Sequence, residues 1–379
     1  MHVHMIFIVR THSLPPKNMD LQDFLQSIGE EVDDAEEESF LLFSQDIPSA
    51  NLGFIDSRST TVDISILGED YTVHQSPTLL SSSRSRGTTG AVVWKITPQF
   101  AEWISQPPIK NETETETKKQ KQNPLWSHFI LSSTSTIVEL GCGISGLVGL
   151  ALAPSVKHYL ATDQEYVRKL FWENVYLNAE VAYKHHHPSQ RSRGVSHGKK
   201  QRTKHKHDHD NRHHPTGIDA NINISFTTLD WETDIPSLLK DTIGLGDNDN
   251  KDKGFDLLIS CDCIYNEALT RPFLRTCAEI CRLRPIYTPT DTDIDTNSRK
   301  SQPHRQTQKQ SESESSANAD VPLNPTICVI AQHLRSPEVF ETWLREALED
   351  FRVWRVRDEV LSDGLRGGTG NVVHLLALR

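Results

Sequence analysis

A glycine turn that follows a short apolar strand constrains this chain more than any other feature. Residues 136–146 read Thr-Ile-Val-Glu-Leu-Gly-Cys-Gly-Ile-Ser-Gly, which predicts a buried strand, a tight turn and a helix that begins at Leu147. Because glycine has no β-carbon, such a turn lets the backbone approach a bound ligand, and it points the helix N-terminus at that ligand. The sequence therefore predicts a nucleotide site at this turn.

The spacing of this turn leaves two cofactors open. Gly141, Gly143 and Gly146 satisfy G-x-G-x-x-G, the dinucleotide fingerprint of the Rossmann fold, and Asp163 follows at about twenty residues, where an acid binds ribose hydroxyls. NAD and S-adenosylmethionine both fit that pattern. Glu139 beside the turn would repel a diphosphate, whereas it would attract the sulfonium and ammonium groups of S-adenosylmethionine. The acid therefore favours S-adenosylmethionine.

Composition limits the partners and the packed fraction of the chain. Only 36% of the 379 residues are hydrophobic, which is low for a fully folded chain, so we expect part of it to remain unpacked. The net charge of −11 argues against nucleic acid as the main ligand, because phosphate contacts need a basic face. An acidic surface suits a basic protein substrate, although solubility alone also favours such a charge. We expect a monomer that needs no direct contact with nucleic acid.

The cysteines and the N-terminal residues indicate the compartment. None of the six cysteines has a paired metal-binding spacing, and those in or beside predicted strands fit a reducing environment. The apolar run at residues 5–9 is too short for a signal peptide or a membrane span. We expect a cytoplasmic protein without a membrane segment, with the nucleus as the other possibility.

Three polar segments look inserted into one folded domain. Residues 107–123 are charged and threonine-rich, residues 184–215 are basic and histidine-rich, and residues 287–320 contain almost no apolar side chain. None can bury enough surface to offset the entropy of ordering, so we expect mobile loops. No cysteine or folded scaffold fixes a coordination geometry for the histidines, so we predict no metal site. The chain then divides into a variable N-terminal extension, residues 1–60, and a domain over residues 61–379.

Outside these insertions, short apolar runs alternate with amphipathic segments. The predicted strands are residues 137–140, 158–163, 222–229, 255–260, 327–331, 353–357 and 372–378. The predicted helices are residues 21–28, 98–104, 145–153, 165–178, 269–283 and 337–348. Such alternation is typical of an α/β fold in which helices cover both faces of a parallel sheet. Only a glycine-rich link, residues 362–371, joins the last two strands, which predicts an antiparallel hairpin at the C-terminal edge.

Further motifs accompany the glycine turn in chain order. They are GTTGAVVW at residues 87–94, NVYLN at 174–178, Asp-Trp at 230–231, Asp-Cys-Ile-Tyr at 262–265 and a glycine-rich block at 367–378. Together they resemble the motifs of seven-β-strand protein-lysine methyltransferases, and the last block resembles most closely the fungal ribosomal lysine N-methyltransferase 5 type. The resemblance covers about residues 60–379 without the insertions. It implies a class I methyltransferase (Rossmann-like) sheet of seven strands, S-adenosylmethionine as cofactor and a protein substrate, for this type a large-subunit ribosomal protein.

The cofactor residues are expected at the carboxyl ends of the strands, where α/β sheets bind ligands. The residues at or just after the ends of the first three strands are Glu139, Gly141, Cys142, Gly143, Asp163, Asp230 and Trp231. Asp163 offers two oxygens to the ribose hydroxyls, Asp230 can accept from the adenine amino group, and the Trp231 indole can pack on the ring. The resemblance adds Trp94, which closes over the cofactor in the family, and Cys261, which lines the adenine side in relatives. For Asp163 the alternative is a helix cap, and for both tryptophans it is a core position.

The implied reaction is methyl transfer to a lysine nitrogen. Asp262 and Tyr265 match the Asp-x-x-Tyr motif of the family, and we predict that they bind and orient the lysine. A carboxylate there can help the ammonium to lose its proton, although it also stabilises the charged form, which hinders methylation.

Two other functions stay open at this stage. An NAD-dependent oxidoreductase would need a catalytic base and a dinucleotide-length site, and the Asp-Trp motif and the terminal hairpin argue against it. A non-catalytic interaction module could retain the cofactor pocket, although the intact Asp262 and Tyr265 of the family motif argue against this hypothesis. The sequence thus favours an S-adenosylmethionine-dependent protein-lysine N-methyltransferase.

Overall fold

Seven stretches of the chain are described in the computed structural model of the protein. They are residues 21–48, 53–82, 88–106, 123–184, 222–245, 252–288 and 323–379. The three predicted insertions, including the histidine-rich segment, lie almost entirely outside these stretches, so their mobility stays a prediction. Among the helices of the described stretches, none combines the length and the apolar composition that a membrane span requires.

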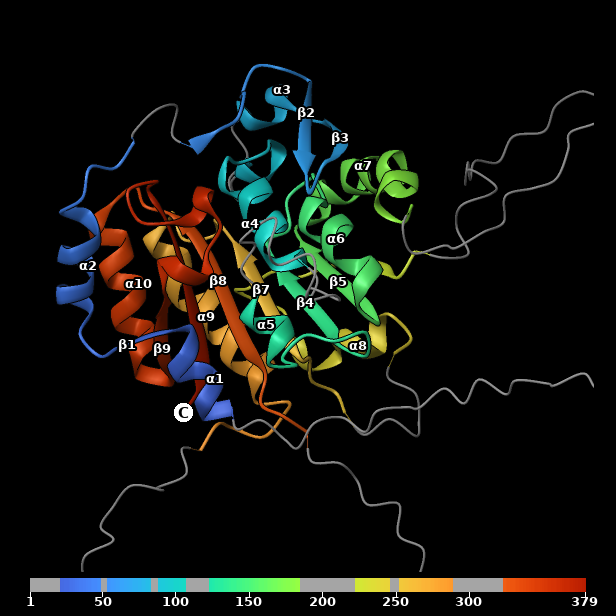
Figure 1. The fold of residues 1–379 in the computed structure, drawn as a ribbon. Helices are drawn as coiled ribbons and strands as arrows, with labels where there is room; N and C mark the ends of the chain where they lie inside the picture. The colour runs from blue at the N-terminus through green and yellow to red at the C-terminus, as the bar shows by residue number, and fades with distance from the viewer. Residues whose placement is uncertain are drawn as a thin grey trace, which may run out of the picture.

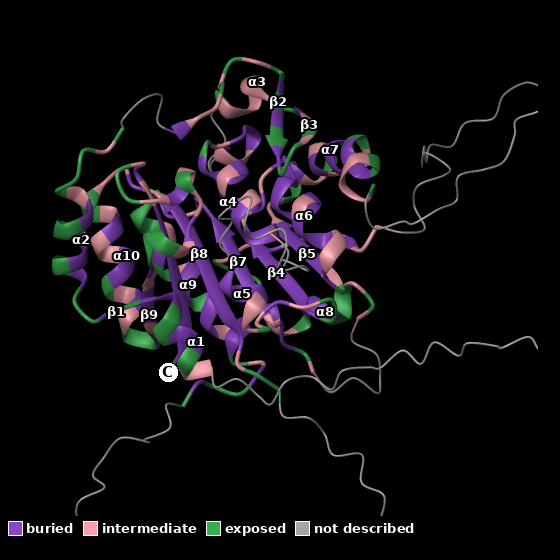
Figure 2. Ribbon diagram, viewed as in Figure 1, coloured by how far each residue is buried: buried purple, intermediate pink, exposed green. Residues whose placement is uncertain are grey.

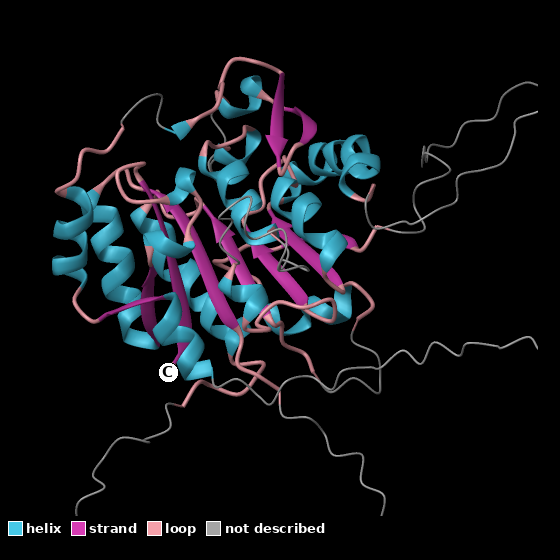
Figure 3. Ribbon diagram, in the orientation of Figure 1, coloured by secondary structure: helices cyan, strands magenta, loops and turns pink. Residues whose placement is uncertain are grey.

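Strands and helices alternate along the described chain (Figure 3). The strands are β1 (Gly29–Val32), β2 (Thr61–Ile66), β3 (Glu69–His74), β4 (Thr136–Leu140), β5 (His158–Asp163), β6 (Ile224–Thr228), β7 (Leu257–Cys261), β8 (Ile327–His333), β9 (Phe351–Val356) and β10 (Asn371–Leu378). The α-helices are α1 (Leu21–Ile28), α2 (Ala35–Phe43), α3 (Pro77–Leu80), α4 (Ile96–Ser105), α5 (Pro124–Ser127), α6 (Leu147–Leu152), α7 (Glu165–Ala182), α8 (Leu239–Thr242), α9 (Glu267–Cys281) and α10 (Pro337–Asp350). The seven predicted strands and six predicted helices are all present, with their ends shifted by a few residues.

The central sheet has the order β1-β9-β10-β8-β7-β4-β5-β6 (Figure 1). Strand β4 pairs in parallel with β5 and β7, and the parallel pairing continues to β6 on one side and to β8 on the other. Strand β10 runs antiparallel to both β8 and β9. The predicted α/β fold with a C-terminal antiparallel hairpin is therefore confirmed.

Strand β1 adds an eighth strand at the edge of this sheet, which the sequence did not predict. It pairs antiparallel with β9, and Glu31 and Glu30 form ion pairs with Arg352 and Arg355 of that strand at 2.6 and 3.0 Å. Four residues with two glutamates carry no clear strand pattern of their own, so the partner strand supplies what the local sequence lacks. Part of the segment that we expected to be an extension thus completes the main sheet.

The helices lie in two layers, one on each face of the sheet. One hydrophobic cluster joins the inward faces of α1, α4, α6 and α7 to the sheet, and a second cluster joins those of α2, α8, α9 and α10. Strands β4 and β7 are buried along their whole length because they lie between the two layers (Figure 2). Helix α10 begins as predicted, because the Ser336 side chain accepts a hydrogen bond from the Val339 backbone and Pro337 occupies the first turn.

A separate hairpin of β2 and β3 was missed in the sequence, although alternate residues of β2 are apolar and buried. The motif at residues 174–178 attaches this hairpin to α7. The Asn174 side chain exchanges two hydrogen bonds with the backbone of His74, at 2.8 and 2.9 Å, and Asn178 does the same with Thr72, at 3.0 and 2.8 Å. Asn174 also donates to the Ile144 carbonyl in the glycine turn at 2.8 Å, so the hairpin is tied to the predicted site.

Candidate active site

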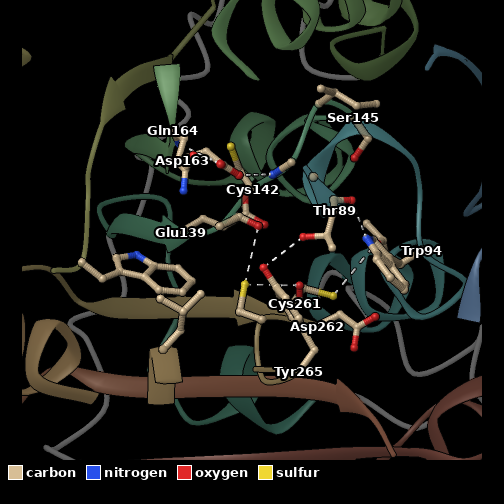
Figure 4. Close-up of a pocket in the computed structure, with 18 of the residues that line it drawn as sticks. Thr89, Trp94, Glu139, Cys142, Ser145, Asp163, Gln164, Cys261, Asp262 and Tyr265 are labelled. Atoms are coloured by element: carbon tan, nitrogen blue, oxygen red, sulfur yellow. Dashed lines mark hydrogen bonds between the residues drawn. The ribbon is translucent and has the colours of Figure 1, made fainter. Parts of the chain in front are cut away.

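The candidate site is a cavity at the carboxyl ends of β4, β5 and β7. Strand β4 lies between β5 and β7 in the sheet. The chain continues from β4 to β5 on one side and later returns to β7 on the other side. Ligands of open α/β sheets bind at such a switch point, where the connecting loops leave a crevice. The residues predicted for the site all line this cavity: Trp94, Glu139, Gly141, Cys142, Gly143, Asp163, Asp230, Trp231, Cys261, Asp262 and Tyr265 (Figure 4). Their individual roles stay predictions.

The glycine turn has the geometry that its sequence predicted. Gly141 and Gly143 have φ angles of 71° and 61°, a region that residues with a side chain rarely adopt. A β-carbon at Gly141 would collide with the Cys263 sulfur. The backbone amide of Gly141 donates to the Thr162 carbonyl at 2.9 Å, which joins the turn to the neighbouring strand.

Glu139 lies in β4, one residue before the strand ends at Leu140, and its carboxyl group is buried. It is only 2% exposed, and its Oε2 atom makes no hydrogen bond that meets ordinary geometric limits. Burial raises the pKa of Glu139 to about 8, the Tyr159 hydroxyl opposes this shift, and the negative charge of Asp163 adds to it. A buried oxygen without a partner is costly, so the position suits a bound cation or donor.

Asp163, at the end of β5, holds the glycine turn in place. One of its oxygens accepts from the Gly143 amide at 2.8 Å, and the other accepts from the Gln164 amide at 2.7 Å. Burial raises the pKa of Asp163 to about 6, while these two backbone hydrogen bonds lower it. Each carboxylate oxygen can accept a further hydrogen bond, so the predicted contact with ribose hydroxyls remains chemically available.

Two tryptophans line the cavity. Trp231 is half-buried, contacts the Phe273 ring edge-on at 5.1 Å, and lies against Gly141. Trp94 is also half-buried and packs against Phe54, with ring centroids 4.4 Å apart and planes tilted by 37°. Because both indoles line the cavity, neither is only a core anchor, and each can offer an aromatic face to a ligand.

Polar and thiol groups complete the lining. The Asp230 Oδ1 atom accepts from the Glu232 amide at 3.0 Å and so helps to shape the turn after β6. Burial raises the pKa of Cys142, Cys261 and Cys263 well above the usual thiol value, so these cysteines are neutral. They contribute compact, polarizable surface and no nucleophile.

Asp262 has a partner that the sequence did not indicate. Its two carboxylate oxygens accept from the Arg335 guanidinium at 2.7 and 2.6 Å, and one of them also accepts from the His333 amide at 3.1 Å. The Asp262 side chain is 1% exposed. Its predicted contact with the lysine is untested, and the carboxylate is already engaged in a buried ion pair.

Tyr265 lies at the mouth of the cavity and is 37% exposed. The Thr89 hydroxyl donates to the Tyr265 hydroxyl at 3.0 Å, so the loop after β7 meets the segment before α4 (Figure 4). Burial raises the pKa of Tyr265, which keeps its hydroxyl neutral. A neutral phenol beside an open mouth can bind an incoming amine.

Sequence reasoning missed several residues of this site. Thr89, Tyr166, Cys263 and Asn266 line the cavity, and Arg335 lies behind its wall. Thr89 and Cys263 lie within the motifs at residues 87–94 and 262–265. Arg335 follows β8, and only the pairing of β8 with β7 brings it to Asp262. Across the described stretches, no group of three or more His, Cys, Asp or Glu side chains is placed to hold a metal ion.

The strand order, the glycine turn and the acid that follows β5 define the class I methyltransferase fold, a Rossmann-like architecture. Residues 74–192 match the family model described as lysine methyltransferase. This match contains the glycine turn, Trp94, Glu139 and Asp163. The resemblance to lysine methyltransferases stated from the sequence is thereby confirmed.

Several curated relatives are named as lysine methyltransferases. The ribosomal lysine N-methyltransferase 5 of Candida glabrata is 28% identical over 60% of this chain and 73% of its own length. That of Eremothecium gossypii is 26% identical and covers 74% of each chain. A diaminohydroxyphosphoribosylamino-pyrimidine deaminase of Schizosaccharomyces pombe is 34% identical, but the match spans 39% of this chain and only 32% of that protein. The chain thus spans about a third of that relative's length.

Solved structures are more distant. The putative methyltransferase SMU.776, complexed with SAH, aligns with a TM-score of 0.36 and 8% identity over 84% of this chain and 56% of that one. This likeness is too weak to support any statement about ligand or reaction.

Proposed function

We propose that this protein is an S-adenosylmethionine-dependent protein-lysine N-methyltransferase. The observation that carries the proposal is the buried Glu139 carboxyl, which has an oxygen without a partner inside a cavity at the switch point of the sheet. The match of residues 74–192 to lysine methyltransferases supports the same reaction.

The lining of the cavity fits this cofactor better than a dinucleotide. A cationic ligand would stabilise the ionised form of Glu139 beside Asp163, whereas a pyrophosphate would add like charge to this buried space. Asp163 and Trp231 both line the cavity, which supports the proposal that Asp163 accepts from the ribose hydroxyls and that Trp231 packs on the base. When bound, S-adenosylmethionine supplies the electrophilic methyl group.

The main task of the protein is then to present a neutral lysine nitrogen in line with that methyl group. At a pKa of about 10.4, deprotonation of a free lysine at pH 7 costs roughly 4.6 kcal/mol. The half-buried Trp94 indole, together with the Tyr265 ring at the mouth, lowers this cost, because the aromatic rings displace water from the ammonium form. The lysine ammonium would first lose one proton through the mouth to solvent. Its neutral nitrogen could then accept the methyl group that S-adenosylmethionine would supply, with S-adenosylhomocysteine as the leaving product. Alignment supplies much of the remaining acceleration.

The substrate is proposed from the relatives and the charge. The fungal relatives are named for ribosomal lysines, and a chain with a net charge of −11 suits a basic protein such as a ribosomal protein. We expect it to act as a cytoplasmic monomer without direct contact with nucleic acid.

Two measurements test this function. The purified chain is incubated with radiolabelled S-adenosylmethionine and ribosomal proteins from cells that lack it, with Glu139→Gln as the matched variant. We expect one labelled protein with the wild type and none with the variant. Calorimetric titration with NAD and with S-adenosylmethionine separates the oxidoreductase alternative, because binding of NAD alone would refute the proposal. Binding of S-adenosylmethionine without transfer to any protein would instead indicate a non-catalytic module.

A further inference from the structure

Arg335 lies at the end of β8, next to the cavity but outside its lining. Its guanidinium pairs with both oxygens of Asp262, at 2.7 and 2.6 Å, and lies over the Trp94 indole at 4.7 Å from the ring centroid. The two partners come from distant parts of the chain, since Trp94 precedes α4 and Asp262 follows β7. Arg335 therefore joins two walls of the site.

The contacts continue around the mouth of the cavity. The Trp94 indole nitrogen donates to the Thr89 carbonyl at 3.2 Å, and the Thr89 hydroxyl donates to the Tyr265 hydroxyl at 3.0 Å. Tyr265 follows Asp262 by three residues, which closes the circuit back to Arg335. Both loops that would contact an entering lysine are thus held against each other by the Arg335 guanidinium and by the Thr89–Tyr265 hydrogen bond.

The backbone at Asp262 is itself unusual. Its φ angle is 64°, in the left-handed region that a residue with a side chain rarely adopts. The Asp262 amide donates to the Ala331 carbonyl at 2.7 Å, and its carboxylate holds the His333 amide and Arg335. These contacts keep the backbone in a conformation that turns the following residues, including Tyr265, towards the cavity.

We propose that Arg335 is a positioning residue for the methyl acceptor, and that Asp262 serves as its counter-ion and not as a proton acceptor from lysine. This inference rests on the proposed function and extends it to a residue outside the cavity lining. Both oxygens of the Asp262 carboxylate already accept hydrogen bonds from Arg335, so the carboxylate is engaged as the counter-ion of a largely buried ion pair. The pair instead sets the distance between Trp94 and Tyr265.

The kinetic test compares Arg335→Met, Arg335→Lys and Asp262→Asn with the wild type. A displacement of about 1 Å in a positioned group can cost about 100-fold in rate, so we expect kcat to fall at least about tenfold in Arg335→Met. The affinity for S-adenosylmethionine should change by less than about threefold, because Glu139 and Asp163 are untouched. Arg335→Lys, which keeps the charge, should recover part of kcat. The kcat profile against pH should keep its shape in Asp262→Asn.

The matched control is Arg271→Met on α9, an exposed arginine whose guanidinium lies 4.0 Å from Glu349. It should leave both kcat and thermal unfolding unchanged. Should Arg335→Met fail to fold, Arg335→Lys decides through kcat and its pH profile. Wild-type kcat in Arg335→Met or in Arg335→Lys would overturn the inference. It would also be overturned if a limb of the kcat–pH profile disappeared in Asp262→Asn alone.

A second readout needs no activity. Hydrogen exchange in the two loops, residues 88–94 and 261–266, should accelerate together in Arg335→Met if the guanidinium couples them. Unchanged exchange in both loops would overturn the positioning role. If the wild type labels no protein, the proposed function fails, while the exchange measurement still decides whether Arg335 holds the two loops together.

Discussion

Two glutamates are almost equally buried in this protein, yet their surroundings differ in kind. Glu38, on α2, is 6% exposed, and its carboxylate accepts from Arg355 at 2.7 Å and lies 3.3 Å from the His374 ring nitrogen. Burial alone would raise the pKa of Glu38, but hydrogen bonds and charges from His374 and Arg355 lower it overall. Glu139 has no such partner, and its pKa rises to about 8.

The difference distinguishes a structural carboxylate from one that we propose binds a ligand. Glu38 ties α2 to β9 and β10, and its charge is balanced within the protein. The Glu139 carboxyl has a buried oxygen without a hydrogen-bond partner, a state that a folded protein tolerates when a ligand completes the site. Burial alone therefore does not indicate a ligand-binding acid, whereas burial without a partner at the end of a parallel strand makes Glu139 the candidate.

The largest expected effect is on stability at Glu38. In Glu38→Ala, Arg355 and His374 lose their buried partner, so we expect the free energy of unfolding to fall by about 3 kcal/mol. The affinity for S-adenosylmethionine should change by less than twofold. Denaturant unfolding and calorimetric titration measure the two quantities. A variant of full stability and weakened cofactor binding would reverse the comparison.

The next effect is on cofactor affinity at Glu139. Glu139→Gln removes the negative charge that a cationic ligand requires, so we expect the affinity for S-adenosylmethionine to fall about 100-fold, equivalent to about 2.7 kcal/mol. The unfolding midpoint should stay equal or rise, because an ionisable group has left a buried position. If titration shows an undiminished affinity, Glu139 does not bind the cofactor.

The contributions of Glu139 and Glu38 to stability should change in opposite directions with pH. Between pH 4.5, the ordinary pKa of a glutamate, and about pH 8, Glu139 keeps its proton in the folded state and loses it in the unfolded chain. The contribution of Glu139 to the free energy of unfolding therefore declines as the pH rises through this window. The contribution of Glu38, whose folded pKa is lowered, is present above 4.5 and is lost as the pH falls through its folded pKa.

A cation binds the ionised Glu139, so the affinity for S-adenosylmethionine should rise between pH 6 and 7.5, by at most about tenfold per pH unit for each proton released. Titrations at several pH values measure this slope, and Glu139→Gln should flatten it. An affinity that falls with pH in the wild type would contradict the assignment.

The smallest effect is expected for an exposed pair. Lys169 and Glu173 on α7 lie 3.8 Å apart with side chains that are 90% and 51% exposed. Glu173→Gln should change the free energy of unfolding by less than about 0.5 kcal/mol and leave cofactor affinity unaltered. A loss as large as that in Glu38→Ala would show that ion pairing outweighs burial in this fold.

Much of the architecture could be predicted from local sequence. Strands β4 and β5 are apolar runs of the right length, and the turn after β4 needs glycine, so each identifies itself without its neighbours. Glu139 and Asp163 could be placed in the site because parallel strands end at one edge of a sheet. The hairpin at the C-terminus followed from a link too short for a crossover helix.

Other features depend on residues far apart in the chain. The partners of β1 stand more than 300 residues away in β9, and the partner of Asp262 lies 73 residues on, at Arg335. No local pattern encodes such pairings, because an arginine after a strand has the same sequence signature whether it faces solvent or a buried carboxylate. The sequence by itself therefore determined the alternating sheet and the acid at its switch point. Only the tertiary structure decided which buried acids have partners, since pairing depends on the distance between side chains that folding alone establishes.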